Sequence, residues 1–184
     1  MSFNLSEVAF LAAHADEIDE AAAEVALTKA SVFGDRALLA SRFDDNARAV
    51  MELIGARRSA AGKLPAGWLT DLDAAQQATP APVANVRAQR IADSGARVVH
   101  DVTCSVGTEA PAFAGMDWLG SDIDPVRLSM ARYNLGAGAW LARADALAPV
   151  ARGAVIVADP ARRCLLYTSP SPRDRTRSRM PSSA

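Results

Sequence analysis

The spacing of apolar residues changes at about residue 97. Before this point, apolar side chains recur every three or four positions in Ala- and Glu-rich segments, the period of a helix packed on one side. This spacing predicts helices over residues 5–14, 16–33, 43–64 and 81–94. We expect Ser6 to cap the first helix and Asp44 or Asp45 to cap the third, because short polar side chains satisfy free N–H groups at helix starts.

The helix over 81–94 leads directly into the second half of the chain. Its apolar spacing predicts that Val83, Val86 and Ile91 pack inward and that Arg87 faces solvent. Gly95 follows at the position where glycine commonly ends a helix.

Beyond residue 97 the apolar runs are short and do not alternate, as expected for strands covered on both faces. They predict strands over 97–101, 116–121, 140–144 and 154–158, with a helix that starts at Pro125 and ends at Gly136. A second helix, after the first strand, should be short because Pro111 interrupts it. Strands that alternate with helices indicate a parallel sheet. The predicted fold is α/β: a helical N-terminal region (1–75), an incomplete Rossmann-like doubly wound sheet (76–163) and a terminal segment (164–184).

The turn after the first strand is the strongest candidate for a binding site. It reads Thr103-Cys104-Ser105-Val106-Gly107, and such small residues let a ligand approach the backbone closely. A doubly wound sheet binds its ligand at the carboxyl ends of its strands. Asp122 follows Asp101 by about the 20 residues at which an acidic side chain takes a ribose hydroxyl. The pattern predicts a site for a nucleoside-bearing cofactor.

Composition narrows the class of protein. Hydrophobic residues make up 50% and charged residues 22% of the 184 residues, which is typical of a globular chain. There is no apolar run of about 20 residues and no secretory signal pattern, so we expect a cytoplasmic protein without a membrane span. The two cysteines lack metal-type spacing, and no metal site is expected. We expect Cys104 to be a small buried residue and His100 to be structural.

The terminal segment Cys164–Ala184 has a different origin in our interpretation. CLLYTSPSPRD and SRMPSSA both resemble translated parts of a transposase-type sequencing adapter, in the correct order. We therefore expect a non-native tail without fixed structure, and a natural frame that continues past Arg163. A natural basic tail that binds nucleic acid is the alternative. Without the tail, Lys+Arg falls from 20 to 16 and Asp+Glu from 21 to 20, so the net charge changes from −1 to −4. The remainder gives no electrostatic argument for nucleic acid.

Several motifs together resemble one family. They are DVTCSVGTE, GSDIDP, RADAL and VIVADPARR, each at the end of a predicted strand. The stretch resembles the class I S-adenosylmethionine-dependent methyltransferases, and most closely bacterial members with a helical N-terminal region, a DPARR motif and a THUMP-like C-terminal domain. These are similar to RNA methyltransferases. This chain departs from the family's D-x-G-x-G-x-G plan, because Thr103 and Ser105 replace two glycines.

The resemblance implies roles for individual residues. Asp101, Thr103, Ser105 and Gly107 would form the cofactor turn, with the backbone of Ser105 and Gly107 at the methionine end. Asp122, followed by Ile123, would accept hydrogen bonds from the ribose hydroxyls. Asp145 would hold the adenine amino group, with Ala146 beside the ring. Asp159 and Pro160 would form the catalytic edge that holds a target amine. The remaining implications are S-adenosyl-L-methionine as cofactor, RNA as partner and methyl transfer by in-line displacement.

Two alternatives remain open from the sequence. A nicotinamide-dinucleotide-binding oxidoreductase uses the same strand–turn–helix and ribose acid, although a complete G-x-G-x-x-G is absent. A non-catalytic nucleotide-binding module of the same fold is the other, favoured by the replaced glycines. The family's sheet has seven strands, and four are predicted here. We therefore expect an open apolar edge at the fourth strand, poor solubility of the chain as written, and substrate recognition in a C-terminal part beyond Arg163.

Overall fold

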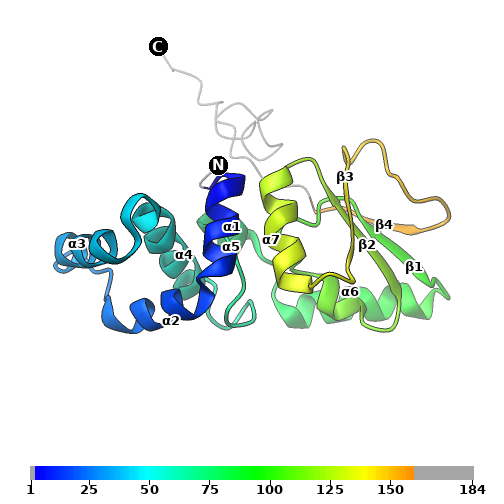
Figure 1. Cartoon of the computed structure of the whole chain (residues 1–184). Coiled ribbons are helices and arrows are strands. Elements are labelled where there is room, and N and C mark those ends of the chain that lie inside the picture. Colours follow the sequence, from blue (N-terminus) through cyan, green and yellow to red (C-terminus); the bar gives the residue numbers. More distant parts are fainter. Residues whose placement is uncertain (1–2, 160–184) are drawn as a thin grey trace, which may run out of the picture.

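A computed structural model describes residues 3–159, and the chain folds into a helical half and a sheet half (Figure 1). The helical half contains α1 (Leu5–Ala13), α2 (Ala15–Glu24), α3 (Val32–Phe43), the 3₁₀ turn η1 (Asp44–Asn46), α4 (Ala47–Ser59) and α5 (Leu72–Gln77). The sheet half contains α6 (Ala81–Asp93), β1 (Val98–Asp101), η2 (Ala110–Phe113), β2 (Asp117–Asp122), α7 (Pro125–Leu135), β3 (Trp140–Arg143) and β4 (Val155–Val157). The α/β class predicted from the sequence is confirmed. The boundary predicted at residue 75 falls inside α5.

The four strands form one parallel sheet in the order β3-β2-β1-β4. The chain builds outward from β1 through β2 to β3 and then returns to the other side of β1 for β4. His100 of β1 pairs with Leu119 of β2 on one side and with Ile156 of β4 on the other. This reversal next to β1 is the switch point at which doubly wound sheets bind ligands, at the carboxyl ends of the strands.

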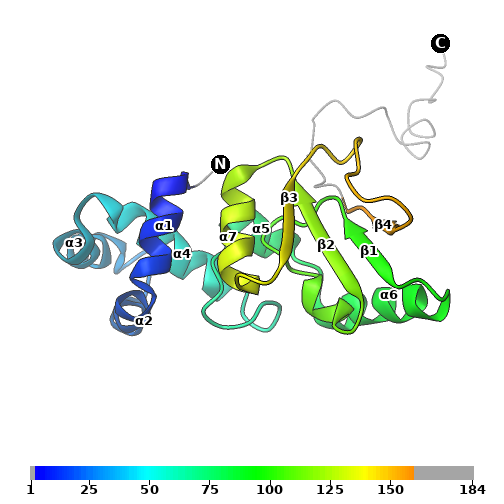
Figure 2. The same ribbon diagram turned by 45° about the vertical axis from the view of Figure 1, so that its right-hand side comes forward.

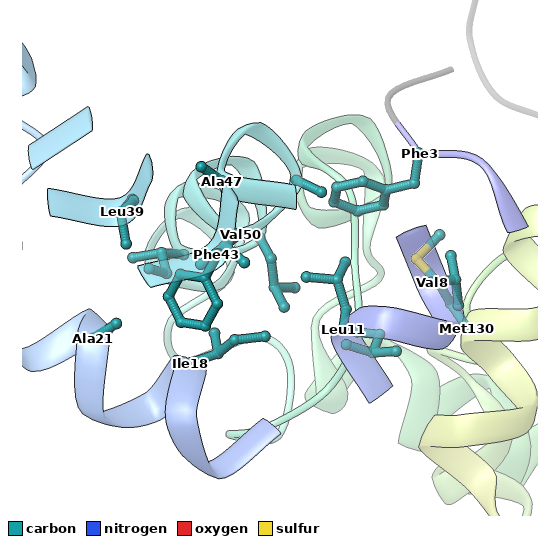
Figure 3. Packing of buried hydrophobic residues seen from close by; sticks show 14 of the residues in the cluster. Phe3, Val8, Leu11, Ile18, Ala21, Leu39, Phe43, Ala47, Val50 and Met130 are labelled. Carbon is teal, nitrogen blue, oxygen red and sulfur yellow. The ribbon is translucent and has the colours of Figure 1, made fainter. Parts of the chain in front are cut away.

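Helix α7 joins the two halves. It lies between the N-terminal helices and the sheet in both ribbon views (Figures 1 and 2). Its Met130 is fully buried in the same hydrophobic core as Val8 and Leu11 of α1 (Figure 3). Val106, from the turn after β1, belongs to this core as well. The core of the helical half therefore extends to the predicted cofactor turn.

Asn134 of α7 adds a polar connection between the halves. Its side-chain amide donates to the carbonyl oxygens of Leu69 at 2.9 Å and Val106 at 3.0 Å, and its Oδ1 accepts from Leu69 N at 2.7 Å. One side chain thus fixes the segment that precedes α5 against the turn that follows β1.

The helical half corrects two predictions. The segment 16–33 is not one helix, because α2 ends at Glu24 and α3 begins at Val32. Asp35 stabilises the connection by accepting hydrogen bonds from Ser31 Oγ and Leu27 N, both at 2.7 Å. The bond from Ser31 is the main reason that the pKa of Asp35 lies below its ordinary value. Local hydrogen bonding outweighs the helix propensity of this segment.

The predicted helix caps are also wrong. Asn4, not Ser6, caps α1 in a reciprocal capping box with Glu7. Asp44 and Asp45 lie in the 3₁₀ turn, and α4 begins after Asn46 without a side-chain cap.

The buried face of helix α6 is rotated from the face that its apolar spacing predicts. Val83 and Val86 are exposed, whereas Ala84 and Ala88 are buried. Of the three residues predicted to pack inward, Ile91 does so, partly buried against the core. Ala88 packs in a second core cluster with Val99, Phe113 and Val157. Small side chains let this helix approach closely, and the rotation turns Arg87 toward Glu109.

In the sheet half, the helices start and end close to the positions predicted from the sequence. Gly95 and Gly136 end α6 and α7 with positive φ angles of 81° each. Pro125 occupies the first turn of α7 after the N-cap Asp124, and the helix after β1 is reduced to the 3₁₀ turn η2. In the part of the chain that is described, no helix has both the length and the apolar character of a membrane span.

Candidate functional site

A cleft of about 930 Å³ opens at the carboxyl ends of β1, β2 and β4. Its walls come from residues within 71–87, 101–109, 122–127 and 157–159. Six of the ten predicted site residues line it, namely Asp101, Thr103, Ser105, Asp122, Ile123 and Asp159. Gly107, Asp145 and Ala146 are not part of this lining, and Pro160 lies outside the described residues.

Asp122 ties the end of β2 to the turn after β1. Its Oδ2 accepts a hydrogen bond from Ser105 N at 3.0 Å, and its Oδ1 accepts one from Asp124 N at 2.9 Å. Each carboxylate oxygen has two lone pairs, so both oxygens retain the capacity to accept from ribose hydroxyls. Asp124 caps α7 through Val126 N at 2.8 Å and thereby fixes the loop that carries Asp122.

Ser105 adopts the left-handed backbone conformation that glycine usually supplies, with φ of 52°. The bond from its N–H to Asp122 stabilises this conformation, and Arg127 donates to its Oγ at 3.0 Å. Ser105, which stands where the family has its second glycine, therefore keeps the shape of the turn, at a cost in backbone strain of about 1 kcal/mol.

Thr103, at the first replaced glycine, has a role of its own. Its Oγ1 accepts a hydrogen bond from Asp159 N at 2.8 Å. Val102 N donates to Val157 O at 2.9 Å, so the pairing of β1 with β4 continues beyond the strands. Thr103 thus fixes the predicted catalytic edge to the predicted cofactor turn.

Gly107 is explained by packing. Its φ is +87°, and a Cβ at this position would lie 2.7 Å from Leu135 Cδ1. A side chain would collide with the end of α7 and strain the backbone. The need for glycine here is independent of any contact with a ligand.

Asp145 and Ala146 follow the edge strand β3 and stay a prediction. The Asp145 side chain is exposed, and its Oδ1 accepts from Leu147 N at 2.9 Å, which stabilises the local turn.

The cleft carries a large excess of negative charge. Two cations, Arg87 and Arg127, face seven acidic side chains in its lining, at positions 71, 73, 101, 109, 122, 124 and 159. The pKa of Asp101 is raised to about 7, chiefly by burial and in smaller part by the negative charges of Glu109 and Asp122. A carboxyl in this position gains or loses its proton near neutral pH.

Glu109 and Arg87 are site residues that the sequence analysis missed. The Glu109 side chain is 5% exposed, and its Oε1 accepts from Thr79 Oγ1 at 2.8 Å and from Arg87. Arg87 also lies 3.8 Å from Asp159 Oδ2. Glu109 ends the DVTCSVGTE motif, and the signal available in the sequence was an acidic residue at the end of the small-residue turn.

Asp71 and Arg127 connect the helical half to the cleft, which both residues line. Asp71 is buried and caps α5 through Ala74 N at 2.7 Å. Arg127 lies 4.0 Å from Asp71 and 3.9 Å from Asp124. The segment 71–80 therefore belongs to the site.

Two residues with reactive side chains are structural. Cys104 is buried, and burial raises the pKa of its thiol well above the usual range, so it stays neutral and unreactive. His100 is fully buried with Nε2 2.9 Å from Ser121 Oγ, and burial lowers its pKa. Among the described residues, no group of three or more His, Cys, Asp or Glu side chains is arranged to hold a metal ion.

The chain is similar to two curated proteins, from the CDC 1551 / Oshkosh and the ATCC 25618 / H37Rv strains of Mycobacterium tuberculosis. Each is 52% identical over 136 residues, and each is named as an uncharacterized S-adenosylmethionine-dependent methyltransferase. The matches cover 67% of this chain but only 37% of either relative, so the chain spans little more than a third of their length. No family model and no solved structure matches the chain.

Proposed function

We propose that this chain is the cofactor-binding part of a class I S-adenosylmethionine-dependent methyltransferase. The observation that carries the proposal is the link from Asp122, at the end of β2, to the backbone of the turn at Ser105. It places a carboxylate with free lone pairs beside a turn of small residues at the switch point of a parallel sheet. The similarity to the two mycobacterial proteins supports the same function.

The charge of the cleft favours this cofactor over a nicotinamide dinucleotide. S-adenosylmethionine carries a sulfonium and an ammonium against one carboxylate, whereas NAD carries a pyrophosphate. Seven acidic side chains against two arginines attract the first and repel the second. Doubly wound sheets that bind dinucleotides place the pyrophosphate at the start of the helix after the first strand, and here only the short turn η2 follows β1.

The residues that would hold the cofactor fall into three groups. Asp122 and Ile123 would take the ribose and the adjacent face of the adenine, and Asp101, Thr103 and Ser105 would surround the methionine end. Asp145 and Ala146 remain our proposal for the far edge of the adenine, and Gly107 keeps the turn in shape. The bound cofactor would supply a methyl group that is already activated by the sulfonium.

Asp159 and Pro160 would form the acceptor edge. Thr103 fixes the backbone of Asp159, and Arg87 lies near its carboxylate at the cleft. The carboxylate would accept a hydrogen bond from the target amine and ease the loss of its proton as the methyl group is transferred in line.

For the acceptor we propose RNA, on the family resemblance. The acidic cleft favours entry of an uncharged base, with the phosphates held elsewhere on the whole protein. A cytoplasmic location is part of the same proposal.

Calorimetry on the intact chain tests the cofactor. We expect S-adenosylmethionine to bind and NAD not to bind, and Asp122→Asn to abolish or greatly weaken the binding. Asp117→Asn, an exposed acid at the start of β2, is the matched control. Binding of NAD alone would overturn the proposal.

Transfer of a labelled methyl group to total RNA and to total protein tests the activity. This assay needs the full-length natural protein, because the chain covers 37% of its relatives. Cofactor binding without transfer to any acceptor would favour the non-catalytic module.

A further inference from the structure

Among the described acids of the cleft lining, Glu109 is the one with a buried side-chain oxygen that has no hydrogen-bond partner. Both of its hydrogen-bond donors, Thr79 and Arg87, reach the same oxygen, Oε1. The other oxygen, Oε2, is buried and has no hydrogen-bond partner in the structure. A buried carboxylate oxygen that is left unpaired is strongly unfavourable, so such an atom at a cleft indicates a missing donor.

The acidic side chains around Glu109 indicate that the missing hydrogen-bond donor is a cation. Glu109 lines the cleft together with Asp101, whose pKa is raised chiefly by burial and also by the negative charge of Glu109. Arg87 compensates one carboxylate and is shared with Asp159, which leaves the pair Asp101 and Glu109 with excess negative charge. A compact cation with several N–H donors would satisfy both the unpaired oxygen and the local potential.

We infer that Glu109 is a cofactor-recognition residue whose Oε2 accepts a hydrogen bond from the α-ammonium group of S-adenosylmethionine. This inference rests on the proposed function, because it assigns a residue to one end of the same ligand. It explains why a nearly fully buried acid ends the turn motif: the ammonium group at the methionine end needs a buried anion in addition to the backbone.

Calorimetry with three adenosine ligands tests the inference in the intact chain. S-adenosylhomocysteine and decarboxylated S-adenosylmethionine both carry the amine, and the second lacks the carboxylate. 5′-Methylthioadenosine lacks the whole amino-acid end. We expect Glu109→Gln to weaken binding of the two amine-bearing ligands by about 10- to 100-fold and to leave methylthioadenosine within about twofold, because bonds to charged groups are the strong ones.

Asp93→Asn is the matched control, since it removes one negative charge from the exposed end of α6, outside the cleft. It should leave the affinity for all three ligands unchanged. Glu109→Asp serves as a second variant, because it keeps the charge but moves the carboxylate away from the ammonium group. It should also weaken binding of the two amine-bearing ligands selectively.

Three results would overturn the inference. If Glu109→Gln weakened methylthioadenosine as much as the amine-bearing ligands, Glu109 would only shape the cleft. If it weakened none of them, the ammonium would bind elsewhere. If the unaltered chain bound no adenosine ligand at all, the proposed function itself would fail, and this result is distinct from the other two.

Discussion

The two halves of the molecule differ in where they place polar side chains. In residues 3–69, every buried side chain is hydrophobic, and the charged residues pair at the surface, as Arg57 does with Asp19 at 2.8 Å. The buried polar and charged residues of the described chain all lie between positions 70 and 121: Thr70, Asp71, His100, Asp101, Glu109 and Ser121. The comparison teaches that residues 3–69 are built for stability, while the residues from position 70 onward, which form the cleft, give up stability to hold acids there.

Truncating the helical core gives the largest expected loss of stability. Leu53 in α4 is fully buried, so Leu53→Ala should lower the free energy of unfolding by about 3–5 kcal/mol. Urea unfolding measures this change, and Phe33→Ala, at a largely exposed position, should have almost no effect. If Leu53→Ala also abolished cofactor binding at a temperature where the protein is folded, the two halves would not have separate roles.

Neutralising a buried acid of the cleft should stabilise the protein, in a direction opposite to the core truncation. Folding raises the pKa of Asp101 from about 4 to about 7, so the folded state favours the protonated carboxyl. The protein is therefore more stable while Asp101 is protonated, and this stability is lost as pH rises from about 4 through 7. Asp101→Asn removes the charge, and we expect a gain of roughly 4 kcal/mol at pH 9, from three pKa units at ~1.4 kcal/mol each.

Unfolding of this variant at pH 5 and pH 9 separates the titration from a simple packing effect. The gain should be much smaller at pH 5, where the folded wild type holds the proton. Asp117→Asn should show no comparable pH dependence. An equal gain at both pH values would contradict the account of Asp101.

The connection between the halves gives an intermediate effect. Asn134→Ala removes three hydrogen bonds and leaves the N–H and C=O of Leu69 and the C=O of Val106 without this partner. We expect a loss of about 2 kcal/mol and faster hydrogen exchange at Leu69 N–H. Asn85→Ala, on the exposed side of α6, is the control. Unchanged exchange at Leu69 would show that Asn134 does not join the halves.

Thr103 gives the smallest expected change in stability. Thr103→Val keeps the shape of the side chain but removes the acceptor for Asp159 N–H, which should lower stability by about 1 kcal/mol and increase hydrogen exchange at Asp159. Thr103→Ser should restore the bond, and Thr108→Val provides a control from another threonine of the cleft. Slow exchange at Asp159 in Thr103→Val would contradict the proposed positioning.

The sequence predicted those features that depend on short segments. The strands, the turn at Thr103–Gly107 and the helix end at Gly136 follow from apolar runs and from glycine or proline at fixed positions. Asp122 was found because its spacing from β1 is a property of the fold. The break between α2 and α3 was missed because hydrogen bonds from Leu27 and Ser31 to Asp35 outweigh local propensity.

The remaining site residues depend on contacts between distant segments. Arg87 meets Glu109 across 22 positions, and Asn134 meets Leu69 across 65. No local pattern records these distances. The rotation of α6 that points Arg87 into the cleft depends on Ala84 and Ala88, whose small size permits close packing.

The measurement that tests the central claim most directly is a backbone NMR titration with S-adenosylmethionine. It reports on both halves of the chain in one experiment. We predict shifts at amides within 101–109 and 122–127 and at Ala74, with residues 15–60 unchanged, and loss of the shifts in Asp122→Asn. Shifts centred on the helical half, or none at millimolar ligand, would contradict the assignment of the cleft as the cofactor site.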